Sequence, residues 1–132
     1  DCKFYNNSAA ADGGAIQIEG DGGNAKIINC EFEGNTATDG GAIKVKGSNT
    51  TIDECTFVNN TATNTTGGAI NVVGRNTTIT NVTVENNTAN TNGGGIFVNG
   101  TNTTISDSTI NGNNASVNGG GVYILGNKAM LL

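Results

Sequence analysis

Apolar residues recur at every second position in short stretches along the whole chain. One set of stretches is Cys2/Phe4, Cys30/Phe32, Cys55/Phe57, Val82/Val84 and Ser108/Ile110. The other is Ile16/Ile18, Ile43/Val45, Ile70/Val72, Ile96/Val98 and Val122/Ile124. A period of two is typical of strands with one buried face, whereas no stretch has the 3.6-residue period of a helix. The pattern therefore predicts an all-β protein built from very short strands.

The same unit is repeated about five times. Gly-Gly-Ala-Ile begins at Gly13, Gly40 and Gly67, and Gly-Gly-Gly followed by Ile or Val begins at Gly93 and Gly119. The intervals between these first glycines are 27, 27, 26 and 26 residues. A fixed period of this length is the signature of a solenoid, in which each repeat forms one structural unit.

A parallel β-helix accommodates both observations, with one coil per repeat and equivalent strands paired in parallel. We expect coils stacked at the inter-strand spacing of about 4.8 Å. The whole chain, 1–132, is then a single β-helix domain with coils at approximately 2–29, 30–54, 55–81, 82–107 and 108–132. Because the chain begins inside a predicted strand, we interpret it as part of a longer chain or as one unit of a filament.

An asparagine follows the first strand of every repeat by the same distance. These residues are Asn7, Asn35, Asn60, Asn87 and Asn113. Stacked side-chain amides can hydrogen-bond one another along the axis of a solenoid. We predict an asparagine ladder at one inward-facing corner, and the alternative is a row of solvent-facing turn asparagines.

Composition and charge exclude several classes of function. The chain has 6 Lys and Arg against 11 Asp and Glu, a net charge of −5 and no histidine. This balance argues against nucleic-acid binding, which needs a basic surface. Catalysis by imidazole and histidine metal sites are impossible, and no apolar run is long enough to span a bilayer. No cofactor is expected.

Three cysteines and two aspartates occupy equivalent positions in neighbouring coils. Cys2, Cys30 and Cys55 match no zinc motif, and we interpret them as small buried fillers, with a disulfide between neighbours as the alternative. Asp12 and Asp39 stack just before the glycine pairs. A solvated turn is the simpler interpretation of these aspartates, and a weak calcium site is the other.

The positions expected to face outward form two columns along the solenoid. One column is Gln17, Lys44, Asn71, Phe97 and Tyr123, and the flanking column is Glu19, Lys46, Val73, Asn99 and Leu125. Neither column places two carboxylates on adjacent coils, as glycoside hydrolysis requires, so we predict that the protein is not an enzyme. We also expect Glu31 and Glu33 to pair with Lys3 or with the Lys44/Lys46 strand.

The same columns become apolar toward the C-terminus. Val73, Phe97, Tyr123 and Leu125 form a candidate contact patch, because exposed apolar patches often mark interfaces. The alternative is that a further chain segment covers them.

Asparagine sequons are frequent, and three of them recur in the equivalent loop of successive coils. Asn49, Asn76 and Asn102 are each followed by two threonines, and Asn64 and Asn81 are further candidates for N-glycosylation. The paired threonines also repeat at the coil spacing, but only one of each pair can face outward, so ice binding is a minor alternative.

Repeats of Phe-x-x-Asn followed by Gly-Gly-Ala-Ile resemble those of chlamydial polymorphic outer-membrane proteins and of adhesin-like proteins of methanogenic archaea. In the last two repeats Val84 and Ile110 replace the Phe, and glycine replaces the Ala. The resemblance implies a single-stranded right-handed β-helix that acts without catalysis at a cell surface, in adhesion or envelope structure. The implied location is extracellular, and the implied partner is a glycan or protein on a host or neighbouring cell.

Two alternatives to this function remain open. The first is a self-assembling extracellular filament subunit that stacks coil on coil through its unpaired strand edges. The second is a β-helix segment of a polysaccharide-active enzyme whose catalytic residues lie elsewhere.

Overall fold

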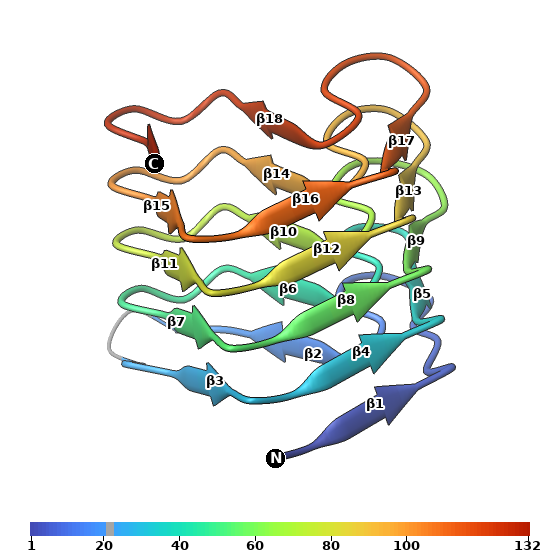
Figure 1. Ribbon diagram of the computed structural model, residues 1–132, viewed down its shortest axis with the longest axis horizontal. Coiled ribbons are helices and arrows are strands. Elements are labelled where there is room, and N and C mark those ends of the chain that lie inside the picture. The colour runs from blue at the N-terminus through green and yellow to red at the C-terminus, as the bar shows by residue number, and fades with distance from the viewer. Residues whose placement is uncertain (21–22) are drawn as a thin grey trace.

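The chain winds about one axis as a stack of coils. The computed structural model describes residues 1–20 and 23–132, and within these ranges every regular element is a strand of two or three residues. Figure 1 shows the first coil at the bottom, the last at the top, and the coils between them in sequence order. The predicted all-β parallel solenoid is confirmed, and no helix in the described ranges is long and apolar enough to cross a membrane.

Four parallel sheets run along the stack, and each takes one strand from successive coils. The β4 sheet contains β1 (Lys3–Tyr5), β4 (Glu31–Glu33), β8 (Thr56–Val58), β12 (Thr83–Glu85) and β16 (Thr109–Asn111). The β6 sheet contains β2 (Ile16–Ile18), β6 (Ile43–Val45), β10 (Ile70–Val72), β14 (Ile96–Val98) and β18 (Val122–Ile124). The β7 sheet contains β3 (Lys26–Ile28), β7 (Thr51–Asp53), β11 (Thr78–Thr80), β15 (Thr104–Ser106) and β19 (Met130–Leu131). The β5 sheet contains β5 (Thr36–Ala37), β9 (Thr61–Ala62), β13 (Thr88–Ala89) and β17 (Asn114–Ala115).

Register follows the sequence repeat. Every pairing between these strands is parallel, and equivalent residues of neighbouring coils are direct partners, as in Phe4 with Phe32 and Phe32 with Phe57. A one-residue slip would turn the buried face of each strand outward, so the repeated apolar pattern fixes this register.

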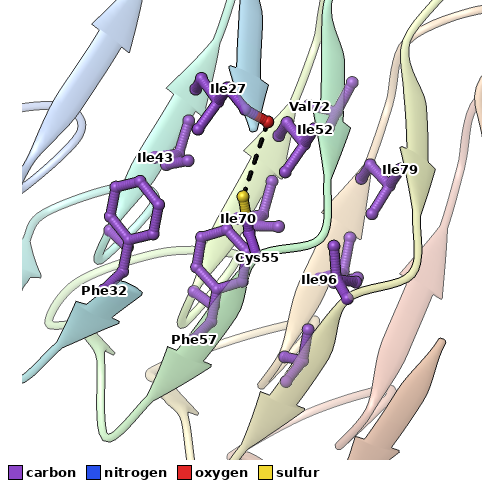
Figure 2. Close-up of a cluster of buried hydrophobic side chains, with 14 of the residues drawn as sticks. Ile27, Phe32, Ile43, Ile52, Cys55, Phe57, Ile70, Val72, Ile79 and Ile96 are labelled. Carbon is purple, nitrogen blue, oxygen red and sulfur yellow. Dashed lines mark hydrogen bonds between the residues drawn. The ribbon is translucent and has the colours of Figure 1, made fainter. Parts of the chain in front are cut away.

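The core is a set of stacks of like side chains. The rings of Phe4, Phe32 and Phe57 are stacked, with neighbouring centroids 4.8 Å apart. The rings are nearly parallel, with interplanar angles of 3° and 5°. Facing them are aliphatic residues of the β6 and β7 sheets, such as Ile70 and Ile79, which are fully buried (Figure 2). Full burial of each such side chain contributes about 1.5–3 kcal/mol.

The strands of two of the four sheets are not among those predicted from the sequence. In the β7 sheet only the central residue of each strand points inward, and Ile27, Ile52, Ile79 and Ile105 fill that place. In the β5 sheet the inward residue is an alanine such as Ala62. In both sheets the buried residue two places earlier is polar, as in Thr50 before Ile52 and Asn60 before Ala62, so no apolar alternation is visible.

The glycine pairs let neighbouring coils approach backbone to backbone. The first glycine of the pair in the third coil, Gly67, has a φ of 68°, in the left-handed region. A Cβ on the second, Gly68, would lie 2.0 Å from the carbonyl oxygen of Gly94 in the next coil. Glycine is thus required here by conformation at one position and by space at the other.

Candidate functional site

The five asparagines expected to form a ladder lie in one column between the β4 and β5 sheets. The Oδ1 of Asn60 accepts hydrogen bonds from the backbone N–H and the Nδ2 of Asn35, at 2.9 and 3.0 Å. Its own Nδ2 donates to Asn87 Oδ1 and to the Phe32 carbonyl. The same pattern joins Asn7 to Asn35 and Asn87 to Asn113. Because Asn35, Asn60 and Asn87 are fully buried, these amides bind the coils to one another and not an external ligand.

A second amide ladder lies on the surface at the corner before the β7 sheet. Asn49, Asn76 and Asn102 all adopt left-handed φ values, of 56° to 58°. Asn76 Nδ2 donates to Asn49 Oδ1 and Asn102 Nδ2 to Asn76 Oδ1, each at 3.1 Å. All three glycosylation candidates are exposed, and the amide nitrogens of Asn76 and Asn102 already donate along the ladder.

The other two candidate glycosylation sites are also exposed but lie outside this ladder. Asn64 follows β9 in the loop toward the next glycine pair, and Asn81 Nδ2 donates to Asp53 Oδ1 at 3.0 Å.

The threonines that follow these corner asparagines point in opposite directions. Thr50, Thr77 and Thr103 are buried, and among the described residues their hydroxyls have no hydrogen-bond partner. Thr51, Thr78 and Thr104 are strand residues on the outer side of the β7 sheet. The pairs therefore place one hydroxyl inside the solenoid and one on its surface.

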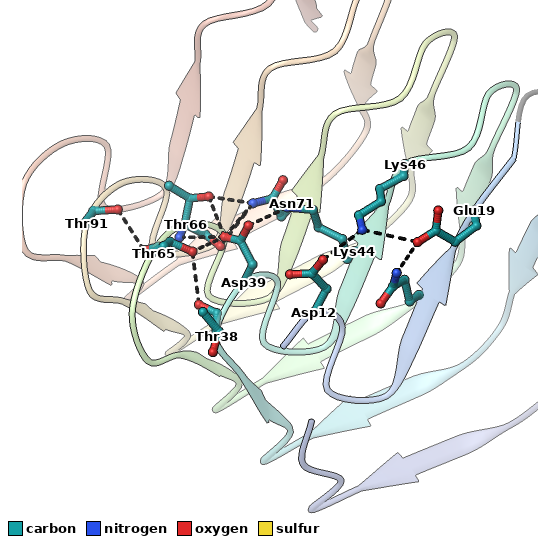
Figure 3. A network of polar contacts seen from close by, with 11 residues as sticks. Asp12, Glu19, Thr38, Asp39, Lys44, Lys46, Thr65, Thr66, Asn71 and Thr91 are labelled. Atoms are coloured by element: carbon teal, nitrogen blue, oxygen red, sulfur yellow. Dashed lines mark hydrogen bonds and ion pairs between the residues drawn. The ribbon is translucent and has the colours of Figure 1, made fainter. Parts of the chain in front are cut away.

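The column expected to face solvent from the β6 sheet is largely covered, which corrects the sequence interpretation. Lys44, Asn71 and Phe97 do point outward from their strands, but they are only 6%, 1% and 7% exposed. The segment that leads into each glycine pair folds back over this face, and Figure 3 shows Thr65 and Thr66 of that segment beside Asn71. An outward position on a strand is thus not a surface position in this sheet.

The candidate contact patch is consequently smaller than predicted. Phe97 is buried and stacks on the half-buried Tyr123, with ring centroids 5.9 Å apart. Val73 and Leu125, in the flanking column, are 39% and 57% exposed. Two of the four predicted patch residues therefore lie on the surface, and Phe97 does not.

Asp12 and Asp39, the stacked aspartates, are each matched by a lysine ammonium. Asp39 Oδ2 lies 2.5 Å from Lys44 Nζ, and Asp12 Oδ2 lies 3.0 Å from Lys46 Nζ, which also contacts Glu19. Burial raises the pKa of Asp39, but hydrogen bonds from Lys44, Thr65 and the Thr66 amide outweigh it, so the pKa is lowered overall. In residues 1–20 and 23–132 no three Cys, Asp or Glu side chains converge to hold a metal ion.

Two of the three cysteines are buried core residues as predicted, but Cys2 in the first coil is exposed, so the interpretation as a buried filler is wrong for Cys2. Cys30 and Cys55 are buried, and their thiols donate to the carbonyls of Ile28 and Asp53, two residues earlier in each case. Burial raises the pKa of the Cys55 thiol, which favours the protonated form. Cys2 is exposed, and all three are free thiols in the structure.

A shallow pocket on the outer side of the β4 sheet combines an aromatic ring, two carboxylates and a hydroxyl group. Tyr5, Glu31, Glu33, Thr56 and Val58 line it. The Tyr5 hydroxyl donates to Glu31, and Lys3 Nζ lies 3.5 Å from the same carboxylate. Sequence reasoning considered the charge pairing of Glu31 and Glu33 but missed the pocket, because Tyr5 comes from a different coil.

The electrostatics of this pocket favour an ionised carboxylate. The hydrogen bond from Tyr5, followed by the charge of Lys3, holds the pKa of Glu31 below its ordinary value. The same hydrogen bond raises the pKa of Tyr5, and the charge of Glu31 raises that of Lys3. Glu31 is thus an acceptor for hydrogen bonds, whereas a general acid needs a raised pKa.

Stacked parallel coils, an internal asparagine ladder and close backbone contacts at glycine pairs define a parallel β-helix. The sequence family described as right-handed beta helix region matches residues 1–132, and the chain belongs to this family. No curated protein and no solved structure matches the chain.

Proposed function

We propose that the chain is a non-catalytic, extracellular β-helix that acts at a cell surface, as an adhesin-like or envelope structural protein. The observation that carries this proposal is the regular polar surface of the solenoid. Threonine columns lie on the outer sides of three sheets: Thr51, Thr78 and Thr104; Thr56, Thr83 and Thr109; and Thr36, Thr61 and Thr88. Such a surface offers hydroxyl groups at every coil along the axis.

The pocket at Tyr5 supports recognition and gives little support to catalysis. Its aromatic ring, carboxylates and threonine hydroxyl are groups that bind the apolar faces and hydroxyls of a saccharide. Its carboxylate Glu31 is paired with Lys3 and has a lowered pKa, which is the wrong direction for a general acid near neutral pH. We therefore propose a surface glycan of a host or neighbouring cell as the ligand.

The extracellular location is supported by the sequons and by the resemblance of the repeats to chlamydial and methanogen surface proteins. Asn49, Asn64, Asn76, Asn81 and Asn102 are exposed at corners and loops of the solenoid. The intact mass of native material tests this part of the proposal. A mass above that of the bare sequence by whole sugar residues is expected, and a mass equal to the bare sequence would remove the glycoprotein assignment.

Binding to a glycan array, with Tyr5→Ala as the test variant, examines the proposed ligand. Tyr5 is 44% exposed, so the variant should fold, and its binding should fall about tenfold because one aromatic contact is lost. Arg75→Ala, at an exposed position outside the pocket and the threonine columns, is the control and should bind as well as the parent.

Two other outcomes would contradict the adhesive role. Release of oligosaccharide from bound polysaccharide would favour the enzymatic alternative. Particles that lengthen with protein concentration in light scattering, without glycan binding, would favour a filament subunit.

A further inference from the structure

A lysine, an asparagine and an aspartate converge beneath the segment that covers the β6 sheet. Lys44 Nζ lies 2.5 Å from Asp39 Oδ2, and Asn71 Nδ2 lies 3.0 Å from Asp39 Oδ1. Lys44 and Asn71 are 6% and 1% exposed, and the Asp39 side chain is 20% exposed. Figure 3 shows Lys44 and Asn71 approaching the two oxygens of this one carboxylate.

The register of the solenoid holds the amine and the amide beside each other. Lys44 in β6 and Asn71 in β10 are direct partners, so their Cα atoms are separated by about the 4.8 Å of one coil. Phe97 is the partner of Asn71 on the other side and is itself buried, which shields the amide from water. Because the fold fixes both residues, a reaction between their side chains is intramolecular and needs no further loss of translational freedom.

We propose that Lys44 and Asn71 form an intramolecular isopeptide bond, with Asp39 carrying the proton between them. Asp39 accepts a proton from the Lys44 ammonium, and the freed lone pair of Nζ attacks Cγ of Asn71. The Cγ–Nδ2 bond then breaks, and the leaving nitrogen takes its protons from Nζ by way of Asp39. The ammonium and the primary amide become one secondary amide plus an ammonium ion, so atoms and charge balance and no oxidant is needed.

Asp39 is positioned for this role by the covering segment. Its Oδ1 accepts from the Thr65 and Thr66 hydroxyls, from the Thr66 N–H and from Asn71, while Oδ2 faces Lys44. These contacts fix the carboxylate between nucleophile and amide, which is the geometry that general acid–base catalysis requires. The exposed edge of Asp39 gives ammonia a route to solvent.

The unlinked arrangement is also costly. Asn71 Oδ1 is buried and has no hydrogen-bond partner among the residues that the structure describes, and the Lys44 ammonium is buried beside it. The new bond removes the buried ammonium, and Asp39 keeps the hydrogen bonds from Thr65 and Thr66.

A lysine beside an asparagine in this column of the β6 sheet occurs in one pair of coils, the second and third. At the place of Lys44 and Asn71, the other coils have Gln17, Phe97 and Tyr123, as the register shows. The bond would therefore link the second coil to the third across the β6 sheet. This inference is independent of the proposed function at a cell surface.

Mass spectrometry of the purified chain tests the bond. Expressed in a host that does not N-glycosylate, the chain should have an intact mass lower than the sequence mass by one ammonia. After denaturation and tryptic digestion, fragment 27–46 should be joined to fragment 47–75, because modified Lys44 resists cleavage and Asn71 lies in the second fragment. Loss of ammonia with these fragments separate would overturn the proposal, since it would mark cyclisation of an asparagine alone.

Variants separate the reaction from folding. Lys44→Arg keeps a cation on Asp39, and Asn71→Ala and Asp39→Asn remove the amide and the proton carrier; all three should keep the full sequence mass. Lys46→Arg, which alters the neighbouring lysine but keeps the tryptic site after residue 46, should still lose ammonia and show the joined fragments. Circular dichroism checks that each variant is folded.

A folded parent at full sequence mass would overturn the proposal. Loss of water in place of ammonia would also overturn it, because it would place the bond between Lys44 and Asp39.

Discussion

Single residues in this protein act through hydrogen bonds that pass from coil to coil. Asn60 is the clearest case, because its side chain satisfies groups above, below and beside it: Asn35, Asn87 and Phe32. Buried amides must find such partners, and a column of identical residues supplies them at every level. The sequence indicated this ladder through the fixed place of asparagine in each repeat.

Asn60→Ala should lower the free energy of unfolding by about 3 kcal/mol, because it removes the acceptor of the buried Asn35 backbone N–H and one hydrogen bond each from Asn35 Nδ2 and the Phe32 carbonyl. Urea denaturation followed by circular dichroism measures the change. Asn7→Ala, at an exposed place in the same column, should cost less than half as much. Equal losses for the two variants would contradict a ladder that depends on burial.

At the buried threonines we expect a substitution to raise stability, in contrast to the loss expected at Asn60. Thr77 has a fully buried hydroxyl with no partner among the described residues, so Thr77→Val should raise the free energy of unfolding by about 1 kcal/mol. Thr78→Val changes the neighbouring exposed hydroxyl and should alter stability by less than about 0.5 kcal/mol. A loss of stability in Thr77→Val would mean that the hydroxyl has a partner, such as an ordered water molecule.

At the scale of elements, strands of two or three residues are stable only because they pair with the equivalent strands of neighbouring coils. Each strand contributes one or two inward side chains, and the bends between strands bring the backbones of adjacent coils into contact at the glycine pairs. The strands of the β4 and β6 sheets could be predicted because inward apolar residues alternate there. Those of the β7 and β5 sheets could not, because the buried residue two places earlier is polar, as in Thr50 before Ile52 and Asn60 before Ala62.

Gly68→Ala should prevent folding or cost more than about 3 kcal/mol, because the new Cβ would lie 2.0 Å from the Gly94 carbonyl oxygen in a backbone that cannot move aside. Gly120→Ala is the equivalent change in the last coil, where the nearest atom would be the Asn113 oxygen at 3.0 Å. It should cost much less. Thermal unfolding of both variants measures the difference, and similar melting temperatures would contradict the close contact.

At the scale of the whole molecule, stability is a sum over coils and over the contacts between them. Each coil contacts only its neighbours, so the chain resembles other repeat proteins in which units can be removed without changing the rest. Removal of a unit must preserve the register between coils, because equivalent residues must remain stacked.

Deletion of residues 82–107, one full coil, should give a folded protein in which Asn113 lies directly on Asn60. The dependence of the unfolding free energy on urea should fall by about one fifth, because less surface is exposed on unfolding. Deletion of 95–107 alone breaks the register and should leave the chain unfolded or aggregated. A folded half-coil deletion would contradict the requirement for stacked equivalent residues.

The sequence by itself determined the coil, its length and its register, because repeated inward residues at a spacing of two can be buried only by stacking like on like. It also placed the asparagines of the ladder. Only the tertiary structure decided which outward residues remain on the surface. Lys44, Asn71 and Phe97 point away from their strands yet are covered, since alternation distinguishes the two sides of a strand but does not reveal a segment that folds over one of them. The grouping of Lys44, Asn71 and Asp39 and the contact of Tyr5 with Glu31 arise in the same way, from the path of the chain between strands.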